Sequence, residues 1–284
     1  MSGKTIIFLV LFSISAITAE IEHAKKYYAS REYEKAYRIF RELAEQGNPE
    51  AQLYVAIFLY KKFVSDPSMP SVIDLLTNAS SKEYPQAMAI LALFYLEQNR
   101  HDEGIKLMEE AALLNSGLAQ YYSGYFDLGY YGKKRNKKHA LEWLKKAVAN
   151  PDHVAKAPAA QLLGVLYYME GQTSEDLKLA VHYFQIASDA NDPDASLVLF
   201  ELFFHGEAGI QKDIEKAKKY FRRALEKGNT EALALAFFIA VKKWDFKKAY
   251  GYFEQVRRKK IDIPAAIKRY DHIIKDHDFE KILN

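Results

Sequence analysis

Small residues return along this chain at a spacing that few folds can accommodate. In four segments a small residue is followed by Ala fifteen positions later, as for Ala36 and Ala51, and Val72 with Ala87 repeats the spacing less well. A sixth pair is nineteen positions apart, since the segment 151–158 adds four residues. The second members of these pairs recur every 32 to 40 positions. Such a period predicts an array of stacked repeats rather than a single wound domain.

Each repeat is predicted to contain two α-helices. In the first helix, apolar or small side chains stand at offsets 0, 3, 4 and 7 from the small residue, which is one face of an α-helix. Offset 11 holds residues that tolerate the left-handed backbone of a helix end: Gly47, Asn115, Asn191 and Gly228. Four residues before the small position stand side chains that suit a helix N-cap: Asn136, Asp176, Asp213 and Asp245. The pattern therefore predicts an all-α fold of antiparallel helix pairs.

The second helix of each repeat carries a residue at offset 5 that decides how closely helices approach. Four repeats have a small residue there: Ala56, Ala92, Gly124 and Gly164. The last two complete repeats have Phe200 and Phe237 instead, which predicts either wider helix spacing or rings that face outward. A helix pair cannot bury both of its faces alone. We therefore expect about six helix pairs stacked as one solenoid.

One stretch, residues 206–229, carries a specific combination of features. It has a glycine-bearing loop, a hydrophobe, an Asp cap, a Lys-Ala pair, an aromatic pair, Ala and Gly-Asn. This combination resembles the Sel-one-like (Sel1-like) repeat of the tetratricopeptide (TPR) superfamily. The resemblance covers about residues 33–258 and is loose in the second repeat, where Val72 and Ser80 replace small or apolar residues. It implies a right-handed superhelix of helix pairs and a scaffold role, because members of this family hold other proteins together.

The first nineteen residues have the pattern of an export signal. A positive residue precedes the apolar run 6–12, and smaller residues continue to Ala19. The run is short for a bilayer-spanning helix, so we predict a signal peptide over residues 1–19, cleaved between Ala19 and Glu20. An uncleaved N-terminal anchor helix is the alternative. After cleavage we expect no membrane span and an exported protein, either periplasmic or secreted.

The repeat array is predicted over residues 20–258, and residues 259–284 follow a different pattern. Pro264 suits the first turn of a helix, and we predict a C-terminal capping helix over 263–276. Three isoleucines are positioned to cover the open end of the array: Ile267, Ile273 and Ile274.

Composition and motifs give no support for an enzyme. The chain has no Cys, which excludes disulfides, thiol nucleophiles and Cys-ligated zinc or iron–sulfur centres. The sequence lacks the motifs of zinc proteases, serine hydrolases and phosphate-binding loops. Asp and His residues at 271–278 form the densest set of metal ligands, and we interpret them as a solvated C-terminus. We therefore predict no catalytic residue, no metal and no cofactor.

One loop and two further tyrosines form the predicted binding surface. The loop 130–138 places two aromatic rings beside five cations. We predict partner contacts for Tyr130, Tyr131, Lys133, Lys134 and Arg135 in this loop, and for Tyr37 and Tyr121, which lie off the apolar stripe. Charge and stacking suit an acidic protein tail or an anionic glycan, and a merely solvated loop is the simplest alternative. A net charge of +3 gives no general attraction to nucleic acid, and none is predicted as a partner.

The sequence thus predicts an exported, non-enzymatic scaffold or adaptor that binds a protein or peptide partner in the groove of the superhelix. The first alternative is recognition of an envelope polysaccharide or peptidoglycan through the basic–aromatic loop. The second is a hydrolase, which would need a cluster of Ser, His or carboxylate side chains on the concave face.

Overall fold

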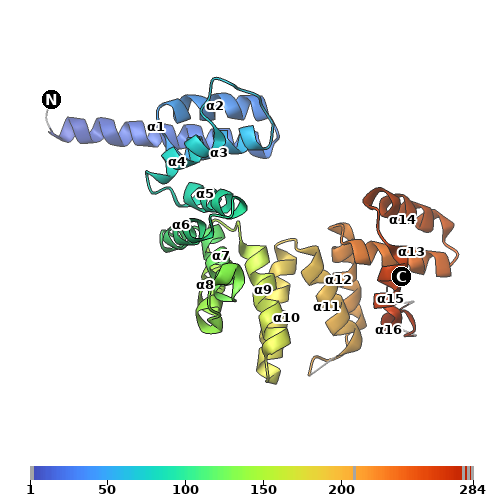
Figure 1. Cartoon of the computed structure of the whole chain (residues 1–284). Coiled ribbons are helices and arrows are strands. Elements are labelled where there is room, and N and C mark those ends of the chain that lie inside the picture. The colour runs from blue at the N-terminus through green and yellow to red at the C-terminus, as the bar shows by residue number, and fades with distance from the viewer. Residues whose placement is uncertain (1–2, 207–208, 277–278, 280–281, 283–284) are drawn as a thin grey trace. The chain divides into compact units, whose positions relative to one another are not determined.

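The computed structural model describes residues 3–206, 209–276, 279 and 282, with side chains from Ser15 onward. Within these residues every regular element is a helix (Figure 1). The chain divides into two compact units, Met1–Trp143 and Leu144–Asn284, here called the N-terminal and C-terminal units. Helix α8 (Lys137–Ala149) contains the boundary between them. The predicted all-α solenoid of helix pairs is confirmed.

The remaining helices follow one another through connections that are mostly short. Those of the N-terminal unit are α1 (Gly3–Ala29), α2 (Tyr33–Glu45), α3 (Pro49–Tyr60), α4 (Val72–Ser80), α5 (Pro85–Glu97), α6 (His101–Leu113), α7 (Gly117–Asp127) and the short 3₁₀ helix η1 (Tyr130–Gly132). Those of the C-terminal unit are α9 (Lys156–Glu170), α10 (Ser174–Asp189), α11 (Pro193–His205), α12 (Ile214–Glu226), α13 (Thr230–Lys242), α14 (Phe246–Lys259), α15 (Ile263–Arg269) and α16 (Asp271–Ile274).

The tightest hairpins are shifted by one helix from the pairs that the sequence spacing suggests. The fifteen-residue spacing predicts that α4 pairs with α5 and that α10 pairs with α11. In the structure α5 packs more extensively on α6 than on α4, and α11 packs more extensively on α12 than on α10. These two hairpins therefore join the second helix of one predicted pair to the first helix of the next.

The predicted helix ends are confirmed in the backbone. The residues at offset 11 all have left-handed φ values: Gly47 82°, Asn115 70°, Asn191 69° and Gly228 80°. Each of them lies just beyond the end of a helix, where the chain must turn before the next helix begins. The small or amide residue at this offset therefore sets the short turn inside four of the predicted pairs.

Three of the four predicted N-caps are confirmed, and one is wrong. Asp213 accepts a hydrogen bond from the Lys216 backbone N–H at 2.9 Å, and Asp245 and Asn136 cap α14 and α8 in the same way. Asp176 is inside α10 instead. Thr173 is the N-cap, and its backbone N–H donates to the Asp176 carboxylate at 3.0 Å while the Asp176 N–H donates back to the Thr173 hydroxyl at 3.1 Å. This reciprocal pair is a capping box, which leaves the acidic residue three positions into the helix.

Small residues and aromatic rings both lie at the contacts between helices. A Cβ added to Gly164 on α9 would lie 2.7 Å from the Phe184 ring on α10, so the absent side chain is what admits that ring. Phe200 does not face outward as one reading of the sequence had it. It is fully buried, with its ring centroid 5.1 Å from that of Phe221. Phe237 is half-buried beside Phe253.

The C-terminal segment and the second half of α1 each contribute side chains to the core of their own unit. The C-terminal segment forms two short helices, α15 and α16, and buries Ile273 and Ile274 in the core of the C-terminal unit. At the other end, Ile21 and Ala24 of α1 are buried in the N-terminal unit, whereas residues 18–20 are exposed. Among the described residues, no helix has both the length and the apolar character needed to cross a membrane.

Candidate partner-binding surfaces

The two tyrosines of the predicted binding loop are held by aromatic contacts. Gly129 turns the chain with a φ of 102°, and η1 follows. The Tyr130 ring stacks on Tyr125 of α7, with centroids 3.9 Å apart and planes 10° apart. Tyr131 meets Phe126 edge-on at 5.4 Å. Tyr130 and Tyr131 remain 48% and 43% exposed, so each ring keeps surface that a partner can contact.

Lys133 is held by carboxylates of its own unit. Its Nζ lies 2.8 Å from Oδ1 of Asp127 and 2.5 Å from Oε1 of Glu109. Burial lowers the pKa of Lys133, but hydrogen bonds to these two carboxylates outweigh it and leave the pKa above its ordinary value. Asp127 itself is only 3% exposed, and its other oxygen lies 2.5 Å from Nδ1 of His139. Lys133 therefore neutralises a buried carboxylate, which is a structural task.

Some of the other predicted contact residues are exposed, and others are engaged within the N-terminal unit. Lys134 and Arg135 are exposed on the loop. Tyr121 is partly buried on α7 and belongs to a row of tyrosines, because its ring stacks on Tyr125 with centroids 6.4 Å apart. Burial and the neighbouring tyrosines raise the pKa of Tyr121. Tyr125 is the member of this row that sequence reasoning missed.

Tyr37 fastens the long connection between α3 and α4. Its hydroxyl donates to Oδ2 of Asp66 at 2.9 Å, and Arg41 lies 3.4 Å from the same oxygen. The pKa of Tyr37 is raised, mainly by burial and to a lesser extent by the hydrogen bond to Asp66. Its ring meets Phe58 edge-on at 5.6 Å. The ring and hydroxyl of Tyr37 are thus engaged within the N-terminal unit.

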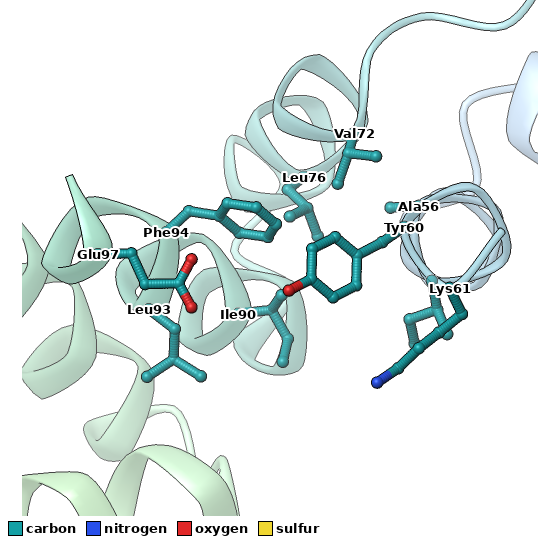
Figure 2. Close-up of a pocket in the computed structure, with 10 residues that line it drawn as sticks. Ala56, Tyr60, Lys61, Val72, Leu76, Ile90, Leu93, Phe94 and Glu97 are labelled. Atoms are coloured by element: carbon teal, nitrogen blue, oxygen red, sulfur yellow. The ribbon is translucent and has the colours of Figure 1, made fainter.

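An apolar groove on the N-terminal unit was not predicted. It has a volume of about 300 Å³ and opens between α3, α4 and α5 (Figure 2). Figure 2 shows Tyr60 reaching from α3 toward α5, where it meets Phe94 edge-on with centroids 5.5 Å apart. Tyr60 is 54% exposed. Lys61 and Glu97 are the charged residues of the lining. Its other residues are apolar: Ala56, Ile57, Val72, Leu76, Ile90 and Leu93.

The groove lies where the repeat pattern is weakest. The sequence pattern is loose in the second repeat, where Val72 replaces the small residue at the start of α4. Helix α4 has only nine residues and follows a connection of eleven residues, 61–71. A shorter helix with a branched side chain at its contact position covers less of α3 and α5. Phe94 therefore lines a groove and is only partly buried, whereas Phe58 and Phe126 at the same position of neighbouring repeats are fully buried.

These features define a helical-repeat protein whose surface grooves and aromatic rings suit contact with other molecules. The described residues contain no group of three His, Asp or Glu side chains that could hold a metal ion. Of the Asp and His group at 271–278, positions 277 and 278 lie outside the described residues.

The chain belongs to the Sel1 repeat family. The Sel1 repeat matches residues 19–48, 85–116, 117–152, 157–192 and 193–229, which together make up more than half of the chain. The last four of these repeats begin with the second helix of a predicted pair, as do the hairpins of α5 with α6, α9 with α10 and α11 with α12. Residues 49–84, which contain α3 and α4, lie outside the matched repeats. Sel1 repeat proteins generally mediate protein–protein interactions and are generally not enzymes.

Known proteins with related sequences or folds agree with this family. A Sel1 repeat protein from Oxalobacter formigenes has a TM-score of 0.69 and 23% identity, over 84% of this chain and 99% of that one. The c5321 protein, a protective antigen of uropathogenic Escherichia coli with an SLR fold, has a TM-score of 0.67 and 19% identity, over 94% of this chain and 59% of that one. An uncharacterized protein of Neisseria meningitidis serogroup B is 28% identical over 209 residues, 72% of this chain. The chain spans 42% of the length of that relative.

Proposed function

We propose that this protein is an exported scaffold that binds a protein partner on the surface of its helical repeats. The observation that carries the proposal is the groove between α3, α4 and α5, which leaves apolar side chains open to solvent in a family of interaction proteins. Open apolar grooves on soluble proteins commonly mark binding sites. The occupant that fits is a peptide segment that inserts one large apolar side chain between two charges of opposite sign.

The two charges at the groove set the direction of that segment. Lys61 and Glu97 are exposed, and each is at the edge of an apolar lining. A partner with an acidic residue on one side of its apolar side chain and a basic residue on the other would complement both. Charge complementarity of this kind contributes mainly to specificity and to the association rate.

The experiment for this proposal places a photo-reactive phenylalanine analogue at Tyr60. The analogue keeps the ring in the groove, and Tyr60 is exposed enough for the exchange to leave the fold intact. The matched control puts the same analogue at Tyr168, which stands at the same offset of α9 and is 41% exposed. We expect one protein to crosslink in the native host from Tyr60 and not from Tyr168. Equal crosslinking from both positions would contradict the groove as the binding site.

The burial of α1 supports export. Ile21 and Ala24 are buried in the core of the N-terminal unit, so cleavage between Ala19 and Glu20 would keep them and would remove the contact of the partly buried Ile17. Mass spectrometry of the exported fraction should find a mature chain that begins at Glu20. A full-length chain in the membrane fraction would favour the uncleaved anchor helix instead.

A second candidate partner is an envelope glycan that stacks on the tyrosine row. The exposed Tyr130 ring, backed by Tyr125 at 3.9 Å, favours it because sugar rings pack on aromatic faces held in place. Lys133 neutralises Asp127 and its loss would disturb the fold, so the exposed Lys134 and Arg135 are the cations to change. Replacing Tyr130 with Ala should reduce binding to purified peptidoglycan, and replacing Lys134 and Arg135 with Ala should reduce its salt dependence. Unchanged binding in both variants would leave only the scaffold role.

A further inference from the structure

A buried position of the repeat is left uncovered in α14. In the first helix of the earlier repeats, the side chain four residues after the small position is exposed by 1% or less: Phe40, Leu76, Met108, Leu144, Phe184 and Phe221. In α14 the small position is Ala249, and the corresponding Phe253 is 43% exposed. The second helices show the same change, because Phe200 at offset 5 is fully buried whereas Phe237 is only half-buried. Among the described residues, side chains suited to a helix–helix contact are thus exposed on α13 and α14.

These side chains form one continuous surface on the hairpin of α13 and α14. Phe246, Tyr250 and Phe253 stand on one stripe of α14, and Phe237, Val241 and Trp244 follow the adjacent edge of α13 and its connection. The two rows meet at both ends, with ring centroids 6.1 Å apart for Phe237 and Phe253 and 5.9 Å apart for Trp244 and Phe246. Trp244, Phe246 and Tyr250 are 77%, 67% and 67% exposed. We call these six residues the C-terminal aromatic face.

The described residues of the C-terminal segment, up to 276, pack elsewhere. Helix α15 packs on α13, and Tyr270, Ile273 and Ile274 are buried in the core of the C-terminal unit together with side chains of α11. The Tyr270 hydroxyl donates to Oε2 of Glu231 at 2.8 Å, near the start of α13. The predicted cap therefore packs near the opposite end of α13. Within the part of the chain that the structure describes, the exposed fractions above leave the aromatic face open to solvent.

The charges around the face select the kind of partner. Helix α14 carries five cations, Lys247, Lys248, Arg257, Arg258 and Lys259, and one carboxylate, Glu254. Lys247 and Arg258 are exposed and stand eleven residues apart, along one edge of the aromatic stripe. Two copies of the chain paired through this face would bring two positive edges together, which costs free energy. The charge pattern therefore favours an acidic partner over a second copy.

We propose that the C-terminal aromatic face binds an amphipathic helix of a partner protein whose apolar side chains are flanked by Asp and Glu. Such a helix would pack on α13 and α14 as the next helix of the array packs on earlier hairpins. Its acidic edges would face Lys247 and Arg258. This proposal rests on the scaffold role and adds to it a second surface and a partner of defined chemistry.

The test uses a synthetic probe and the full mature chain. The probe is an amphipathic peptide of about 18 residues with Leu on one face and Glu along both edges, long enough to form a helix when bound. The chain contains two Trp, and Trp143 is 8% exposed, so a blue shift of the fluorescence on binding reports Trp244. We expect saturable binding of the Glu peptide that weakens with salt. We expect at least about tenfold weaker binding of a peptide with Lys in place of Glu.

Two sets of variants distinguish this surface from general stickiness. Replacing Tyr250 and Phe253 with Ser should raise the Kd for the Glu peptide at least about tenfold, with an unchanged circular dichroism spectrum. Replacing Lys247 and Arg258 with Glu leaves the aromatic residues in place and should reverse the preference toward the Lys peptide. Failure of the Glu peptide to bind, or equal binding of both peptides, would overturn the proposal.

Two further measurements address the other possible occupants. Sedimentation that shows a dimer of the wild-type chain, lost in the Tyr250 and Phe253 variant, would assign the face to a second copy and overturn the proposal. If phosphatidylglycerol vesicles shift the Trp244 fluorescence to the blue and the Glu peptide does not, the face binds an anionic membrane surface. That result would also overturn the proposal. Crosslinking from Tyr60 reports a groove on the N-terminal unit, so a failure here leaves that result standing, and the reverse also holds.

Discussion

Lys133 and Asp127 form an ion pair that closes the loop between α7 and α8, with Nζ and Oδ1 2.8 Å apart. The same loop is fastened by the backbone N–H of Asn136, which donates to the carbonyl oxygen of Asp127 at 2.7 Å. Asp127 is 3% exposed, so its charge depends on partners within the protein rather than on water. One residue of α7 therefore holds both the backbone and the leading cation of the basic–aromatic loop.

Replacing Lys133 with Met should destabilise the protein. The change leaves a buried carboxylate without its cation, and removing one partner of such a pair costs more than the pair itself contributes. Because the Lys133 side chain is 27% exposed and His139 is close to the other oxygen, we expect a loss of about 2 kcal/mol in the free energy of unfolding. Urea denaturation followed by circular dichroism measures it.

The control for this variant is Lys134→Met, which removes an exposed cation from the same loop and should change the stability by less than about 0.5 kcal/mol. Adding Asp127→Asn to Lys133→Met should restore part of the loss, because the uncompensated charge is then gone. Equal stability of the wild type and Lys133→Met would show that Lys133 is available to bind a partner.

Acid should weaken the C-terminal unit through its helix caps. Hydrogen bonds from the backbone of Lys216 and Lys248 lower the pKa values of Asp213 and Asp245. A carboxyl with a lowered folded pKa stabilises the fold above its unfolded pKa, and this contribution is lost as the pH falls through the folded value. The urea midpoint should therefore decline below about pH 4. With both residues replaced by Asn, which still caps a helix, the decline should be shallower. An identical decline in the double variant would assign the acid sensitivity to other carboxyls.

Local pattern was sufficient to predict the helix pairs and most of the helix ends that it named. Gly47 and Asn191 could be identified because a left-handed turn restricts the residue type at one position. Asp213 could be identified because a cap needs a short side-chain oxygen directly before the helix. Asp176 has the same residue type three positions later in a capping box, and Thr173 was the signal that distinguishes the two.

The surface could not be predicted in this way, because it depends on contacts between residues far apart in sequence. Lys133 looked like a free cation until Glu109, 24 residues earlier, was placed beside it. Tyr37 looked like an interface residue, but Asp66, 29 residues later, accepts its hydrogen bond. The groove at Tyr60 is open because the short helix α4 leaves apolar side chains of α3 and α5 uncovered. A local sequence pattern does not show which side chains remain uncovered.

A pair of glycine variants should test how closely the helices approach. Gly164→Ala on α9 would place a methyl group 2.7 Å from the Phe184 ring, which is only 1% exposed, and should cost about 1–3 kcal/mol. Gly251→Ala on α14 meets no atom within 4 Å and should gain about 0.5–1 kcal/mol from helix propensity. Thermal or urea unfolding measures both. If Gly164→Ala were also stabilising, α9 and α10 would be packed less tightly than they are here.

Phe221 and Phe253 should respond differently to truncation although they occupy the same position in successive repeats. Phe221→Ala would open a cavity beside Phe200 and should cost about 3–5 kcal/mol. Phe253→Ala removes a ring that is 43% exposed and should cost less than about 1 kcal/mol in the protein alone. Urea unfolding of the two variants measures the difference. Similar losses would mean that Phe253 is covered in the free protein, and the C-terminal aromatic face would then not be open to a partner.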